Sequence, residues 1–125
     1  MLSIKRVGKH LGAEISGVDL SQPLDDDTFA RIADAFFDNE VAFFRDQRLT
    51  PAQQIAFTRR FGVLEEHVRK ESRLPEFPEI LVISNIVENG KLIGLADAGR
   101  VAVWHADMSY LNAPSAGSAL YALEI

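Results

Sequence analysis

Two side chains that can ligate a metal, His105 and Asp107, stand two residues apart late in the sequence. The apolar run before them predicts a strand over residues 101–107, in which alternate side chains point to the same face. One imidazole nitrogen and one carboxylate oxygen would then meet at one spot, as in the 2-His-1-carboxylate triad of non-haem Fe(II) sites. Because His-x-Asp is a short pattern, the alternative is ordinary hydrogen bonding near a strand end.

A second group of polar side chains, Glu65, Glu66 and His67, falls in a predicted loop. Adjacent residues do not all face one point, so at most one or two of them could share a site, and His67 is the candidate for lining it. His10 lies in a turn between two predicted strands and is expected to be solvated. The run at residues 25–27 is interpreted as the start of a helix rather than a metal site.

Composition limits the classes of protein that the chain can belong to. Its 125 residues fit a single domain, 1–125, and the absence of cysteine excludes disulfides, thiolate metal sites and cysteine nucleophiles. Without a membrane-length apolar run or a signal-peptide pattern, a cytoplasmic protein that binds no membrane is expected. A net charge of −5 argues against nucleic-acid binding. The cluster Arg69, Lys70 and Arg73 is interrupted by Glu71 and is interpreted as a solvated loop.

The elements that would position these residues are short strands with two helices among them. Strands are predicted within residues 2–7, 13–18 and 41–44. Asp25 is expected to cap a helix that ends near Asn39, with apolar positions recurring at helical spacing: Phe29, Ile32, Ala33, Phe36 and Phe37. A second helix is predicted from a capping box, in which Thr50 caps, Pro51 follows and Gln53 stands three residues on.

The second half of the sequence carries turn signals between apolar runs. Residues 74–78 are interpreted as a linker and residues 79–84 as a buried strand. Asn89 and Gly90 predict a two-residue turn that joins residues 86–87 to 92–93 in a hairpin. A connection over residues 94–100 and a final strand over 118–125 complete the mixed α+β, mainly β, pattern.

Ordered segments along the whole chain resemble the taurine dioxygenase-like (TauD/TfdA) family of Fe(II)/2-oxoglutarate-dependent dioxygenases. The segments are residues 12–20, 41–47 (VAFFRDQ), 49–54, Phe61-Gly62 and Trp104-His105-Ala106-Asp107. The resemblance implies a double-stranded β-helix of the jelly-roll or cupin type, decorated by N-terminal helices. It also implies that His105 and Asp107 are iron ligands and that His67 holds the anionic group of a substrate.

The chemistry implied by the resemblance is hydroxylation of a small anionic substrate by dioxygen, with 2-oxoglutarate as cosubstrate. The family's second metal histidine and its oxoglutarate-binding arginine are expected beyond Ile125, so the sequence corresponds to the N-terminal part of the family domain. Lys70 and Val101 stand where taurine-using members have tyrosine and asparagine, which favours another sulfonate or carboxylate over taurine. The alternative is a non-catalytic fragment of the fold, stabilised by association with itself or a partner through open sheet edges.

Overall fold

A computed structural model describes residues 1–94 and 104–124 of the chain. The chain divides into two compact units, residues 1–61 (unit 1) and residues 62–125 (unit 2), and each is described by itself. The mixed α/β character, with few helices and several short strands, confirms the coarse fold class predicted from the sequence. No helix in the described part of the chain is both long and apolar enough to cross a membrane.

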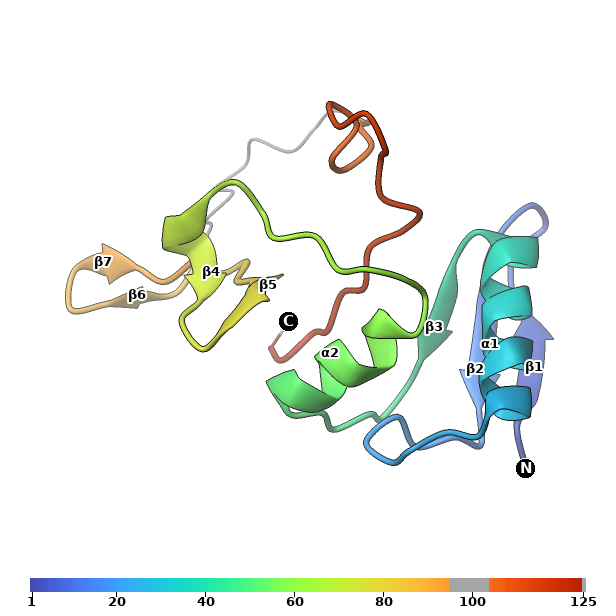
Figure 1. Cartoon of the computed structure of the whole chain (residues 1–125). Coiled ribbons are helices and arrows are strands. Elements are labelled where there is room, and N and C mark those ends of the chain that lie inside the picture. Colours follow the sequence, from blue (N-terminus) through green and yellow to red (C-terminus); the bar gives the residue numbers. More distant parts are fainter. Residues whose placement is uncertain (95–103, 125) are drawn as a thin grey trace. The chain divides into compact units, whose positions relative to one another are not determined.

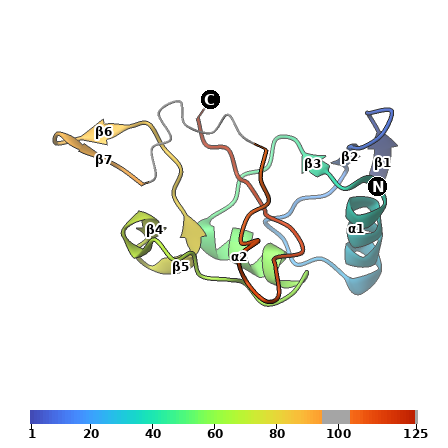
Figure 2. The same cartoon turned by 90° about the horizontal axis from the view of Figure 1, so that it is seen from above.

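Unit 1 is a three-stranded sheet covered by a helix. Strand β1 (Ser3–Arg6) pairs antiparallel with β2 (Ala13–Ser16), and β2 pairs parallel with β3 (Ala42–Phe44). A parallel pair needs a crossover connection, and α1 (Asp26–Asn39) supplies it by packing against the sheet (Figures 1 and 2). The centre of this packing is a cluster of buried apolar side chains: Ile15, Ile32 and Ala35.

Helix α1 begins where the sequence predicts, at an aspartate cap. The Asp25 carboxylate accepts hydrogen bonds from the Thr28 backbone N–H (2.7 Å) and from the Thr28 hydroxyl (2.8 Å). These two bonds, the backbone bond first, hold the pKa of Asp25 below its usual range. The predicted apolar face is confirmed at Ile32, whereas Phe37 is wrongly placed in the core, since it is 62% exposed. It lies at the edge of the apolar face, whose centre also includes Ala35.

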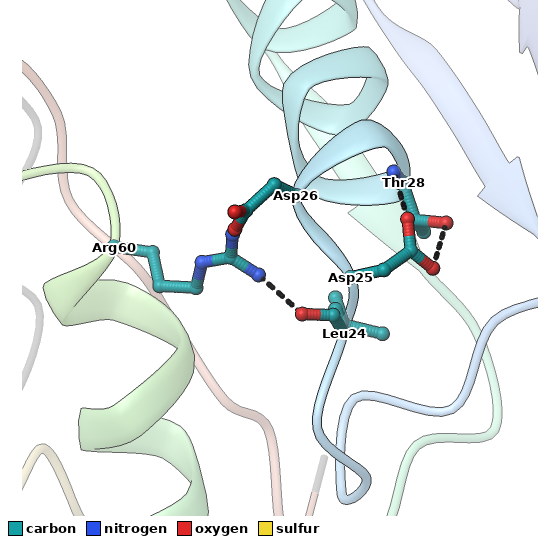
Figure 3. A network of polar contacts seen from close by, with 5 residues as sticks. All are labelled: Leu24, Asp25, Asp26, Thr28 and Arg60. Atoms are coloured by element: carbon teal, nitrogen blue, oxygen red, sulfur yellow. Dashed lines mark hydrogen bonds and ion pairs between the residues drawn. The ribbon is translucent and has the colours of Figure 1, made fainter.

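Helix α2 (Pro51–Arg59) carries the predicted capping box, with Thr50 and Gln53 each bonding the other's backbone N–H. Edge-to-face ring contacts link α2 and the residues that follow it to α1 and β3, with centroid separations of 4.8–6.3 Å: Phe29, Phe36, Phe44, Phe57 and Phe61. Arg60 fastens the end of α2 to the start of α1 (Figure 3). It donates to the Leu24 carbonyl at 2.7 Å, pairs with Asp26 and lies over the Phe29 ring.

Unit 2 begins with a loop and a short 3-10 turn, η1 (Lys70–Ser72), followed by β4 (Arg73–Leu74) and β5 (Phe77–Leu81). The predicted linker over residues 74–78 is therefore wrong, because both of its ends lie in the antiparallel pair β4–β5. The buried strand predicted over 79–84 corresponds to β5, but β5 begins two residues earlier, ends at Leu81 and is half-buried along its length. Leu74 and Phe77 pair across the two-residue turn Pro75-Glu76, so this segment is a tight hairpin that the neighbouring Pro78 does not prevent.

The predicted hairpin is confirmed. Strands β6 (Val87–Glu88) and β7 (Lys91–Leu92) pair antiparallel across Asn89 and Gly90, whose φ values are 50° and 75°. Two consecutive positive φ angles are what a type I′ turn requires, and Asn-Gly adopts them at low cost. The sequence signal was sufficient here because the turn is local.

The segment over residues 104–124 contains turns and bends but no strand. The strands predicted over 101–107 and 118–125 are therefore wrong for their described parts, whereas residues 101–103 and 125 lie outside the described residues, as do 95–100 of the predicted connection. A β-strand forms where the backbone of another segment pairs with its N–H and C=O groups. Within the described chain, no segment pairs in this way with residues 104–124.

Candidate active site

His105 and Asp107 meet in unit 2, although not in the predicted strand. His105 Nε2 lies 3.1 Å from Asp107 Oδ1, and the two side chains are 54% and 59% exposed. Residues 104–106 have no regular structure, and residues 107–110 form a turn in which the Leu111 N–H bonds the Met108 carbonyl at 3.0 Å. The two side chains therefore meet in an irregular segment and not on the face of a strand.

The second oxygen of Asp107 has a partner that the sequence did not reveal. The Ser118 hydroxyl donates to Asp107 Oδ2 at 3.1 Å, so each oxygen of the carboxylate makes one polar contact. A hydrogen bond of this kind orients a ligating carboxylate and leaves its other oxygen directed elsewhere. Ser118 lies eleven residues beyond Asp107 with no motif between them, so only the folded chain could identify it.

The spacing of the two donor atoms can be tested against a metal ion. Two ligand atoms at about 2.1 Å from a divalent ion, on adjacent octahedral positions, are about 3.0 Å apart. The observed 3.1 Å between His105 Nε2 and Asp107 Oδ1 is a hydrogen-bond distance, as in the alternative from the sequence, and it also fits that arrangement. The N/O donor pair suits Fe(II). Within residues 1–94 and 104–124, no third His, Cys, Asp or Glu joins the pair into a group of three candidate ligands.

His67 is half-buried in the loop before η1, as the sequence predicts. Its Nδ1 accepts a hydrogen bond from the Arg69 backbone N–H at 3.1 Å, and its carbonyl accepts one from Arg73 Nε at 2.7 Å. Glu66 pairs with Arg73 Nη1 at 2.7 Å, whereas Glu65 is exposed. His67 belongs to no group of three metal-ligand candidates in the described chain, so the structure keeps it separate from a three-ligand set with His105 and Asp107.

The interpretation of Arg69, Lys70 and Arg73 as a solvated cluster is wrong for Arg73. The Arg73 side chain is only 15% exposed and binds both Glu66 and the His67 backbone, whereas Arg69 and Lys70 are exposed. A basic residue near acidic neighbours usually indicates a solvated surface. Arg73 lies in β4, and its side chain reaches back to residues six and seven positions earlier in the loop.

Comparison with known proteins assigns the class. The Taurine catabolism dioxygenase TauD, TfdA family matches residues 3–125. The chain belongs to this family, whose members use Fe(II) and 2-oxoglutarate.

Individual relatives agree with the family. The chain is 33% identical over 120 residues to pentalenolactone F synthase from Streptomyces arenae, covering 94% of this chain and 40% of that protein. It is 31% identical over 122 residues to the alpha-ketoglutarate-dependent 2,4-dichlorophenoxyacetate dioxygenase of Cupriavidus pinatubonensis, covering 90% of this chain and 42% of that protein. The chain thus spans well under half the length of these relatives.

Solved structures that resemble this chain belong to the same class of dioxygenase. A crystal structure of a proposed alpha-ketoglutarate-dependent taurine dioxygenase from Burkholderia xenovorans superimposes with a TM-score of 0.64 at 35% identity. The match covers 70% of this chain and 32% of that one. The similarity extends the family assignment from the sequence to the arrangement of helices and strands.

Proposed function

We propose that this chain supplies two metal ligands and one substrate contact to an Fe(II)/2-oxoglutarate-dependent dioxygenase that hydroxylates a small anionic substrate, a carboxylate or a sulfonate. In this proposal the two units belong to one domain with a double-stranded β-helix core. The observation that carries it is the 3.1 Å approach of His105 Nε2 to Asp107 Oδ1 in a chain of the TauD, TfdA family. The relative named for 2,4-dichlorophenoxyacetate motivates the choice of an anionic substrate.

Bound Fe(II) and 2-oxoglutarate would supply the oxidising chemistry, in which dioxygen hydroxylates a C–H bond while 2-oxoglutarate is converted to succinate and carbon dioxide. His105 and Asp107 would occupy two coordination positions, and the carboxylate would offset part of the ion's charge. Binding the ion requires His105 Nε2 to give up any proton it carries, so affinity should fall as the pH is lowered. The Ser118 hydroxyl keeps the carboxylate oriented.

The role proposed for His67 is to donate a hydrogen bond to the anionic group of the substrate. Its Nδ1 already accepts the Arg69 N–H, so the neutral ring carries its proton on Nε2. That N–H is the kind of donor that a carboxylate or sulfonate oxygen accepts.

Fe(II) titration of the 125-residue chain under anaerobic conditions tests the metal site. We expect the His105→Ala chain to bind Fe(II) at least about tenfold more weakly than the unsubstituted chain, because one of its two ligands is lost. His10→Ala is the matched control, since it removes an imidazole from an exposed turn in unit 1. Equal Fe(II) affinity for the His105→Ala and unsubstituted chains would contradict the proposed ligand role.

The second candidate function is a non-catalytic fragment that associates through its exposed apolar surface. The hairpin β6–β7 leaves Val87 and Leu92 59% and 55% exposed, and Leu120 and Leu123 are more than 80% exposed. Light scattering separates the two functions: a stable oligomer that binds no Fe(II) supports the fragment. One Fe(II) bound per chain supports the enzyme.

A further inference from the structure

We infer that Arg73 is the positioning residue of His67: it holds the backbone of the loop so that the imidazole presents Nε2–H, and not Nδ1–H, to an anionic ligand. This inference rests on the proposed function for its ligand, a carboxylate or sulfonate group. The positioning itself rests on contacts within unit 2. It assigns to Arg73 a role that depends on where the side chain points and not on its charge alone.

The backbone of Arg73 is held in a strand, from which its side chain contacts the loop. Its own backbone pairs with Leu81 across β4 and β5, and its side chain is 15% exposed. From there, Nε donates to the His67 carbonyl and Nη1 to a carboxylate oxygen of Glu66, both at 2.7 Å. One planar guanidinium therefore fixes two consecutive residues, and limited exposure strengthens both charge-assisted bonds.

The other side of the loop is held by backbone bonds. The Ser72 N–H donates to the Arg69 carbonyl at 3.2 Å, and the Val82 N–H donates to the Ser72 carbonyl at 2.9 Å. Ser72 is buried, so η1 is anchored against the end of β5. Arg69 is thereby placed so that its own N–H reaches His67 Nδ1.

The large apolar residues of this loop are mostly exposed. Val63 and Val68 are 93% and 62% exposed, and Leu64 is half-buried. The hydrogen bonds of His67 with Arg69 and Arg73 are therefore expected to contribute most to the orientation of the half-buried imidazole. Without the Arg73 bonds, the imidazole should keep its N–H donor but become free to rotate. Binding of an anion should then weaken, because the donor is no longer held in one orientation.

The experiment is NMR of the ¹⁵N-labelled 125-residue chain. In the unsubstituted chain we expect the Nε2–H tautomer of His67 and a scalar coupling between the Arg69 amide nitrogen and His67 Nδ1, transmitted through their hydrogen bond. In Arg73→Gln the coupling should disappear, and Arg73→Lys should not restore it, because an ammonium lacks the planar fork. Arg69→Ala is the matched control: it removes one positive charge but keeps the backbone N–H, so the coupling should persist.

Folding of the variants is checked in the same spectra, through the amide signals of β5 and of the β6–β7 hairpin. If Arg73→Gln fails to fold, Glu66→Gln provides the second variant, since it weakens one of the two Arg73 contacts and should reduce the coupling. A coupling that persists in a folded Arg73→Gln chain, or one that is absent from the unsubstituted chain, would overturn the inference.

Phenoxyacetate, a simple carboxylate probe, tests the ligand. We expect Arg73→Gln to raise its dissociation constant about tenfold, the scale of effect for residues that orient a binding histidine. His67→Ala should cost at least as much, and the double variant no more than His67→Ala, because Arg73 acts through His67. If the coupling behaves as expected but phenoxyacetate does not bind, the proposed substrate role of His67 fails while the positioning by Arg73 is supported.

Discussion

Unit 1 and unit 2 are similar in length but are held together differently. The buried apolar side chains of the described chain all lie in unit 1: Ala13, Ile15, Leu20, Ile32 and Ala35. In unit 2 the buried residue is Ser72, and large apolar side chains are exposed from Val63 to Leu123. Strands of two to five residues and side-chain hydrogen bonds maintain the described part of unit 2.

The residues with candidate chemistry, His67, His105 and Asp107, all lie in unit 2, among whose described residues no apolar side chain is buried. Binding groups commonly lie on segments of low local stability. In unit 1, by contrast, the helix caps and ring contacts are complete within residues 1–61. We therefore expect substitutions in the core of unit 1 to lower the free energy of unfolding, and substitutions in unit 2 to change its local order.

The largest effect is expected from Ile32→Ala in unit 1. Ile32 is 1% exposed and packs with Ile15 and Ala35, so truncation should lower the free energy of unfolding by about 2–5 kcal/mol. Hydrogen exchange should show the loss in the amides of β2 and α1 and little change in β5. Phe37→Ala, at a side chain that is 62% exposed, should cost less than about 1 kcal/mol. Equal loss of protection in both units would refute the distinction between them.

A smaller difference, confined to unit 2, is expected between Gly94→Ala and Gly90→Ala. Gly94 has φ +74°, and an added Cβ would lie 2.4 Å from the Val82 carbonyl oxygen. Gly90 has nearly the same φ, +75°, but open space around it, so Gly90→Ala carries only the backbone strain of about 1–2 kcal/mol. Gly94→Ala should cost about 1–3 kcal/mol more than Gly90→Ala, because backbone atoms must move. The amide signals of Val82 and Ile93 report the change, and equal effects of the two substitutions would exclude the close contact.

Local signals in the sequence were sufficient for the parts of the fold that are built locally. Thr50, Pro51 and Gln53 identify the start of α2, and Asn89-Gly90 identifies the β6–β7 turn, because caps and tight turns are made by residues a few positions apart. The approach of His105 to Asp107 was also anticipated, although through a strand that the described residues do not form.

Side-chain contacts outside caps and tight turns had no such signal. Arg73 bonds the carbonyl of His67, six residues earlier, and Ser118 reaches Asp107 across eleven residues, and no motif marks either contact. Phe37 satisfies the helical period and yet is exposed, because the sheet of unit 1 covers only the centre of the apolar face of α1. Periodicity identifies which face of a helix is apolar, but the width of the covered stripe depends on the partner element.

The smallest effect expected is on the pH dependence of unit 1. The hydrogen bonds from Thr28 to Asp25, and those from the Ser21 hydroxyl and N–H to Asp19, lower the pKa of both carboxyl groups. A carboxyl whose pKa is lower in the folded state stabilises that state above its unfolded pKa of about 3.9, and the stabilisation is lost as the pH falls through the folded pKa. The melting temperature of unit 1 should therefore decrease below about pH 4.

The variant Asp25→Asn tests the contribution of the cap. An asparagine can still cap α1 but does not titrate, so the decrease in melting temperature should be smaller, and the remaining decrease should come from Asp19. Thr28→Ala, which removes the hydroxyl but keeps the backbone N–H, should give an intermediate slope. Equal slopes for all three chains would show that the Asp25 cap does not couple the stability of unit 1 to pH.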